Sequence, residues 1–110
     1  MNGNDIVIVS ATRTAIGKFG GQFATTSAIE LGTAVAKSAI QKAKLSPDQI
    51  DTVIFGNVLQ AGLGQNPARQ VGLKAGLLHS STALTVNEVC GSGLKAIILA
   101  AQSLRLGDAK

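Results

Sequence analysis

The chain has 110 residues, enough for one compact domain with a hydrophobic core. Apolar residues make up 45% of it, charged residues only 15%, and the 3 aromatic residues are all Phe. We therefore expect a core of Ala, Val, Ile and Leu, a mixture that favours an α/β protein whose small residues let helices lie close to a sheet. The net charge is +4, but the basic residues are scattered, which argues against nucleic-acid binding.

A single cysteine, Cys90, excludes an internal disulfide. No cationic and apolar leader opens the sequence, and no apolar run approaches the ~18 residues of a membrane span. The sequence thus predicts no signal peptide and no membrane partner. It predicts a cytoplasmic protein. No cluster of His, Cys, Asp and Glu has the spacing of metal ligands, so no metal is expected.

The expected elements alternate between strands and helices. Asp5–Ser10 is a short β-branched run that predicts a buried strand. Ser27 and Glu30 have the spacing of a capping box, ahead of an amphipathic helix expected from about Ala28 to Lys44. Residues 46–49 combine an N-cap serine with proline at the first helical position, which predicts one further helical turn.

The second half of the chain continues this alternation. Residues 51–59 predict a second strand, and residues 81–89 predict a third. Between them, Asn66 and Pro67 open a helix expected to end near Ala75. The order β-α-β-α-β-α favours parallel strands joined by right-handed crossovers.

A final helix is predicted after Gly93. From Leu94 to Leu104, apolar side chains cover nearly the whole circumference of this helix. A helix of this kind lies between two layers rather than at a surface. One three-stranded sheet cannot cover both of its sides, so we expect a further covering element outside these residues.

Cys90 stands where the third strand leads into this helix. Backbone N–H groups and the positive end of a helix dipole stabilise a thiolate relative to a thiol. Gly91 and Gly93 keep side chains away, and free N–H groups there would hold an oxyanion formed by attack on a carbonyl. The arrangement suits a nucleophile for acyl transfer. The alternative is a small buried apolar residue, as free cysteines often are, and position alone does not choose between the two.

Three segments, in order, are IVSATRTAIGKFGG, VIFGNVLQAGLGQNPARQ and VNEVCGSGLKAI. They resemble the thiolases, the family of acetyl-CoA acetyltransferases. The resemblance implies a thiolase-like α/β fold of two similar halves, each a sheet flanked by helices, with the cysteine helix in the middle layer. Residues 1–110 would be the amino-terminal β-α-β-α-β-α portion of one half, an incomplete amino-terminal thiolase domain.

The resemblance also implies a reaction. Cys90 would take the acyl group of an acyl-CoA, and the enolate of a second acetyl-CoA would attack that group in a Claisen condensation. The product would be acetoacetyl-CoA, and thiolysis is the reverse. A coenzyme A thioester is then the substrate, no cofactor is implied, and the full-length protein is expected to be a homodimer or homotetramer in lipid metabolism.

The chain corresponds to roughly the first quarter of the family. The family's second catalytic cysteine and its Asn-Glu-Ala-Phe and Gly-His-Pro motifs have no counterpart here, so the isolated chain is expected to be inactive. His79, in an expected turn, is not a candidate for the missing histidine. GLGQNPARQ lacks the P-loop and dinucleotide patterns and is interpreted as a structural loop. Arg69 and Gln70 are expected to be surface or interface groups, and Arg13 and Lys18 solvated charges.

Two other functions stay open at this point. A β-ketoacyl synthase-like condensing enzyme shares the fold and a cysteine at a helix start, although NEVCGSGLKA and GQNPARQ are closer to the thiolases. A non-catalytic assembly module would only pack against another chain. Also open are the biosynthetic or degradative direction, the acyl-chain length, the CoA-binding residues and the choice between dimer and tetramer.

Overall fold

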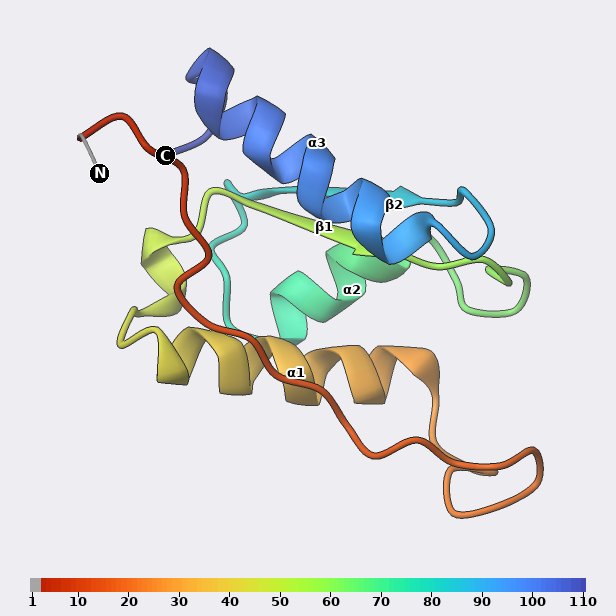
Figure 1. The fold of residues 1–110 in the computed structure, drawn as a ribbon. Coiled ribbons are helices and arrows are strands. Elements are labelled where there is room, and N and C mark those ends of the chain that lie inside the picture. Colours follow the sequence, from red (N-terminus) through yellow and green to blue (C-terminus); the bar gives the residue numbers. More distant parts are fainter. Residues whose placement is uncertain (1–2) are drawn as a thin grey trace.

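The computed structural model describes residues 3–110 and confirms most of the expected alternation (Figure 1). Each predicted helix is present, and two of the three predicted strands are present. In chain order the elements are helix α1 (Ala28–Lys42), the 3-10 turn η1 (Pro47–Gln49), strand β1 (Thr52–Gly56), helix α2 (Pro67–Lys74), strand β2 (Thr82–Val86) and helix α3 (Ser92–Leu106).

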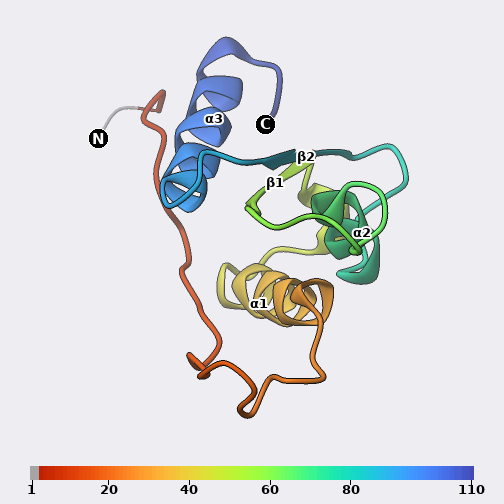
Figure 2. The same cartoon turned by 90° about the vertical axis from the view of Figure 1, so that its right-hand side faces the viewer.

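The two strands form a parallel sheet, with Thr52 opposite Thr82 and Gly56 opposite Val86. Helix α3 packs on one face of this sheet, and α2 packs on the other (Figures 1 and 2). Helix α1 lies beyond the sheet on the α2 side and packs against α2. This layered arrangement with parallel strands confirms the α/β prediction.

Local capping sets where the helices begin. The Ser27 hydroxyl accepts from the Glu30 N–H at 3.0 Å, and the Glu30 carboxylate accepts from the Ser27 N–H at 2.7 Å. The Ser46 N–H likewise donates to Gln49 Oε1 at 2.9 Å, just before Pro47 begins η1. These bonds satisfy backbone donors that a helix start leaves free. Both capping predictions are confirmed.

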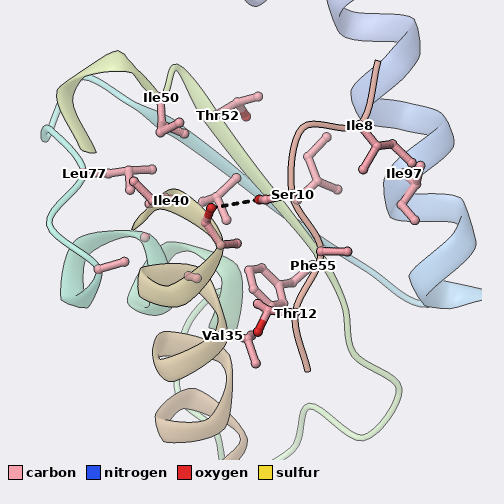
Figure 3. A pocket seen from close by; sticks show the side chains of 17 residues that line it. Ile8, Ser10, Thr12, Val35, Ile40, Ile50, Thr52, Phe55, Leu77 and Ile97 are labelled. Carbon is pink, nitrogen blue, oxygen red and sulfur yellow. Dashed lines mark hydrogen bonds between the residues drawn. The ribbon is translucent and has the colours of Figure 1, made fainter. Parts of the chain in front are cut away.

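The strand predicted over Asp5–Ser10 is wrong. Within the described chain, these residues pair with neither strand and run as extended backbone from beside α3, where Ile8 lies near Ile97, to α1 (Figure 3). Ser10 Oγ donates to the Ala39 carbonyl on α1 at 2.8 Å, and Ile8 stays 75% exposed. An apolar cavity of about 520 Å³ is lined by residues of this segment, of α1 and of β1. The β-branched run favours extended backbone, but a strand also needs a hydrogen-bonded neighbour.

The core lies between α1, α2 and the sheet and confirms the expected aliphatic composition. Helices α1 and α2 pack closely because Gly32 of α1 faces Val71 of α2: a Cβ built on Gly32 would stand 2.8 Å from Val71 Cγ2. On the other side of the sheet, Ala96 of α3 is buried. The buried apolar residues are Ile29, Ala68, Val71, Ala75, Leu77, Ala96 and Ala109.

Helix α3 confirms the last predicted helix, and its outer side is open. Leu94 is 66% exposed and Ile97 is 54% exposed. The sheet covers one side of the helix, and no other described element packs on it. The two-sided cover expected for a helix apolar all round is therefore only half present among residues 3–110.

One window has the length and mean hydropathy of a membrane span, although no uninterrupted apolar run in the sequence is that long. Val89–Leu106 has 18 residues with a mean hydropathy of 1.2, enough to cross a membrane by length and composition alone. Lys95, Gln102 and other polar residues interrupt it, which is why a count of uninterrupted apolar residues overlooked it. The core helix of a soluble protein passes the same test.

Candidate active site

Cys90 lies on the turn between β2 and α3, and its side chain is exposed. Gly91 is the N-cap residue of α3, so the thiol stands just ahead of the first helical turn. The predicted strand-to-helix placement is confirmed. The alternative of a buried apolar cysteine does not hold for the described chain.

The residue before Cys90 has an unusual backbone conformation. Val89 has a φ of 50°, in the left-handed region. For a β-branched residue this region is a genuine outlier, and such strain costs on the order of 1–3 kcal/mol. It persists only where surrounding bonds hold it, so the neighbours of Val89 determine the path of the chain into Cys90.

Two side chains hold this turn from opposite directions. The Ser92 hydroxyl donates to the Val89 carbonyl at 2.6 Å and accepts from the Glu88 N–H at 2.9 Å. The Asn87 side-chain oxygen accepts from the Val89 N–H at 2.9 Å. Ser92 is only 5% exposed, so these bonds are sheltered from competing water. Both peptide groups that flank Val89 are thereby fixed.

The backbone amides near the thiol differ in part from expectation. The Gly91 N–H donates to the Glu88 carbonyl at 3.1 Å, and the Ser92 N–H donates to the Val89 carbonyl at 3.2 Å. The Gly91 amide is therefore not free to hold an oxyanion, because it closes the turn. At Gly93 a Cβ would meet nothing within 4 Å, so this side of the helix start is open.

The turn is also anchored to the first strand. The Asn57 N–H donates to the Val86 carbonyl at 2.9 Å, which extends the ladder beyond β1. Asn87 Nδ2 donates to the Val58 carbonyl at 3.3 Å. Both bonds join the segment after β1 to the segment that leads to Cys90. The thiol therefore has a fixed position relative to the sheet.

The glycine-rich loop before α2 is structural, as expected. Gln70 Nε2 donates to the Leu63 carbonyl at 2.7 Å and to the Gln65 carbonyl at 2.9 Å, closing the loop onto α2. The Arg69 guanidinium donates to the Ser81 carbonyl at 2.7 Å and to the His79 carbonyl at 3.0 Å. Arg69 and Gln70 thus make intramolecular bonds that their sequence positions did not reveal. His79 lies in the turn where it was expected.

Asn66 has a structural role, and the sequence predicted only part of it, the start of α2. Its backbone φ is 43°, and its side-chain oxygen accepts from the Arg69 N–H at 3.3 Å and from the Thr85 hydroxyl at 2.6 Å. Thr85 Oγ1 in turn accepts from the Ala68 N–H at 2.9 Å. The Asn-Pro pair indicated a helix start, but only the fold brings the cap into contact with β2.

The remaining charged and metal-ligating residues form no site. Arg13 and Lys18 are exposed, and the Arg13 guanidinium donates to the Thr14 carbonyl at 2.9 Å. Within residues 3–110, no group of three or more His, Cys, Asp and Glu side chains is placed to hold a metal ion.

The family follows from comparison with known proteins. A family model described as thiolase, N-terminal domain, matches residues 6–110. The chain belongs to the thiolase family. A solved Acat5 thiolase from Ascaris suum, in complex with coenzyme A, superposes with a TM-score of 0.90 at 45% identity, over 91% of this chain and 26% of that one. The resemblance and the thiolase-like fold class are both confirmed.

Curated relatives agree with this assignment. Acetyl-CoA acetyltransferase of Escherichia coli is 61% identical over 104 residues, which cover 94% of this chain and 26% of the relative. The cytosolic acetyl-CoA acetyltransferase of Mus musculus is 52% identical over 103 residues, 94% of this chain and 26% of the relative. The chain thus spans about a quarter of the length of the curated thiolases that it matches.

Proposed function

We propose that this chain is the amino-terminal part of an acetyl-CoA C-acetyltransferase, a thiolase that moves acyl groups between CoA thioesters through Cys90. One observation carries the proposal: an exposed thiol stands at the start of α3 on a strained turn that side-chain and backbone hydrogen bonds hold. Exposure gives a substrate access, and the fixed turn holds the sulfur for attack.

In the proposed first step, the Cys90 thiolate attacks the carbonyl carbon of an acyl-CoA. The bond from that carbon to the CoA sulfur breaks, and CoA leaves as a thiolate that takes up the proton released from the Cys90 thiol. Because one thioester replaces another, the step is readily reversible. The acyl group is then held on Cys90 as an S-acyl enzyme.

The second step joins two carbon chains. A second acetyl-CoA loses a proton from its methyl group, and the resulting enolate carbon attacks the S-acyl carbonyl. The Cys90 thiolate leaves, and with an acetyl group the product is acetoacetyl-CoA. Thiolysis follows the same steps in reverse. The group that removes the methyl proton belongs, in this proposal, to the part of the enzyme beyond these residues.

The proposal also covers the substrate, the cellular location and the oligomeric state of the enzyme. The coenzyme A thioester is a substrate, and no further cofactor takes part. The solved thiolase with coenzyme A and the relative named as cytosolic support a CoA ester as substrate and the cytoplasm as location. We further propose that the full-length protein is a homodimer or homotetramer, with the segment around β2 at the two-fold contact.

The test uses a full-length chimera, in which this chain replaces the matching quarter of the Escherichia coli relative. After incubation with acetyl-CoA, mass spectrometry should find an acetyl group on the peptide that holds Cys90. Cys90→Ala should abolish that adduct and acetoacetyl-CoA thiolysis. Ser103→Ala, at the far end of α3, is the matched control and should leave both intact. Stable acetylation of another residue, or full turnover by Cys90→Ala, would contradict the assignment.

A second candidate is a non-catalytic assembly module, favoured by the exposed apolar side of α3. A partner chain would pack against that side of α3 and cover its exposed apolar residues. The same chimera separates the two candidates: a module should fold in the chimera but leave Cys90 without an acetyl group and the enzyme without turnover.

A further inference from the structure

We propose that Ser92 is a positioning residue for Cys90, which it holds in place through the backbone of Val89. The kinetic part of this inference rests on the proposed function, whereas its structural part concerns only the reactivity of the thiol. Ser92 is the first residue of α3, two positions after Cys90.

The direction of its hydrogen bonds sets Ser92 apart from an ordinary helix cap. A capping side chain reaches forward to N–H groups inside the helix. The Ser92 hydroxyl instead reaches back across Cys90, accepting from the Glu88 N–H and donating to the Val89 carbonyl. Its two partners are the N–H at the start of the Glu88–Val89 dipeptide and the carbonyl at its end, so this one hydroxyl spans the two residues that include the strained Val89.

Because Val89 is strained, the loss of the Ser92 hydrogen bonds should change its conformation. Val89 adopts a φ of 50° although a β-branched side chain disfavours this region. Without the Ser92 hydroxyl, the Glu88 N–H loses its partner, and the Val89 carbonyl keeps only the 3.2 Å bond from the Ser92 backbone N–H, so Val89 can relax toward a negative φ. Because Cys90 is the next residue, rotation at Val89 moves its α-carbon and its sulfur. The Asn87 side chain bonds the N–H of Val89 but not its carbonyl.

Burial and close packing fix the position of the Ser92 side chain. It is 5% exposed, and a Cβ on Gly56 would stand 2.7 Å from the Ser92 Cβ. The end of β1 therefore presses on the residue that spans the turn. Gly56 at the end of β1 contacts Ser92, and Ser92 bonds Val89, which precedes Cys90.

The experiment compares four versions of the full-length chimera: the parent, Ser92→Ala, Val89→Gly and the double variant. The first measurement is the rate at which iodoacetamide alkylates Cys90 at one fixed pH, followed on the isolated peptide by mass spectrometry. The second is kcat and KM for acetoacetyl-CoA thiolysis, together with the thermal unfolding midpoint. Ser103→Ala supplies the matched control on the same helix.

Ser92→Ala should lower kcat about ten- to a hundredfold with little change in KM, because a displaced nucleophile slows the reaction without weakening substrate binding. The alkylation rate should change as well. Glycine adopts a positive φ freely, so removal of the Ser92 hydroxyl should cost much less in the Val89→Gly background. A purely structural role would lower the unfolding midpoint equally in both backgrounds and leave the kcat of the folded enzyme unchanged.

Three results would overturn the inference. One is a Ser92→Ala enzyme with the parent's kcat and alkylation rate. Another is an equal loss of kcat in the two Val89 backgrounds, since the hydroxyl would then not act through Val89. If Ser92→Ala fails to fold, the comparison of Val89→Gly with the double variant decides: a loss as large as tenfold in alkylation rate would contradict the inference. A parent chimera that lacks thiolysis would refute the proposed function alone, because the alkylation rates still test the positioning.

Discussion

Gly56 at the end of β1 lies against Ser92 at the start of α3, where a Cβ on Gly56 would stand 2.5 Å from the Ser92 carbonyl carbon. Real Cβ atoms do not approach backbone so closely. The absence of a side chain at Gly56 thus lets the helix start rest on the strand, backbone against backbone. This contact places the Cys90 turn directly above the carboxyl end of the parallel sheet.

Gly56→Ala should therefore displace the first turn of α3. In the full-length chimera we expect a loss of about 1–3 kcal/mol in stability, as overpacking usually costs, together with a lower acetylation rate at Cys90. Thermal unfolding and the rate of acetyl transfer measure the two effects. Gly93→Ala is the matched control for the unfolding midpoint, because a Cβ there meets nothing within 4 Å. An unfolding midpoint lowered equally by both substitutions would contradict the contact.

Asn66 should contribute to stability through both its side chain and its backbone. Asn66→Ala removes the cap on α2 and the bond to Thr85 and places Ala at a φ of 43°. The expected loss in the chimera is about 1–2 kcal/mol, a typical value for a helix cap. Asn66→Gly should lose less, because glycine tolerates the positive φ. Urea denaturation of the three proteins compares them, and equal losses would show that the backbone conformation contributes nothing.

The exposed side of α3 predicts opposite effects in the isolated chain and in the full-length chimera. Leu94→Gln and Ile97→Gln should make the isolated 110 residues more soluble, because both side chains are more than half exposed there. In the chimera the same substitutions should lower stability, by about 1.5–3 kcal/mol for each side chain that becomes fully buried. Light scattering and thermal unfolding measure the two effects.

The unsubstituted isolated chain should aggregate and show no acetoacetyl-CoA thiolysis. A soluble monomer with a sharp thermal transition would contradict the expected instability. Measurable turnover would contradict the larger claim that catalytic groups lie outside these residues.

Leu84 tests the proposed assembly. It is 45% exposed on β2 in the isolated chain, although an apolar residue at a two-fold contact would be buried in a dimer. Leu84→Glu should shift the full-length chimera toward smaller species, because two like charges would meet across the axis. Sedimentation velocity measures the change, with Leu84→Met as the control. An unchanged sedimentation coefficient for Leu84→Glu would place the contact elsewhere.

Local features could be predicted from the sequence because neighbouring residues decide them. The capping bonds of Ser27 and Ser46 join groups three residues apart. Helical periodicity marked α1, and a mostly apolar stretch after Gly93 marked α3. The alternation of strand and helix along the chain favoured parallel pairing of β1 and β2. The same reasoning placed Cys90 between a strand and a helix.

Contacts between distant segments were decided only by the tertiary structure. Whether Asp5–Ser10 pairs depends on a neighbouring edge, and here the hydroxyl of Ser10 bonds α1 instead. The carbonyl groups that Arg69 binds lie ten and twelve residues away. The left-handed Val89 and the occupied Gly91 amide arise because the turn closes on itself above Gly56. A linear pattern reports which residues are near in sequence, whereas these bonds depend on which atoms meet in space.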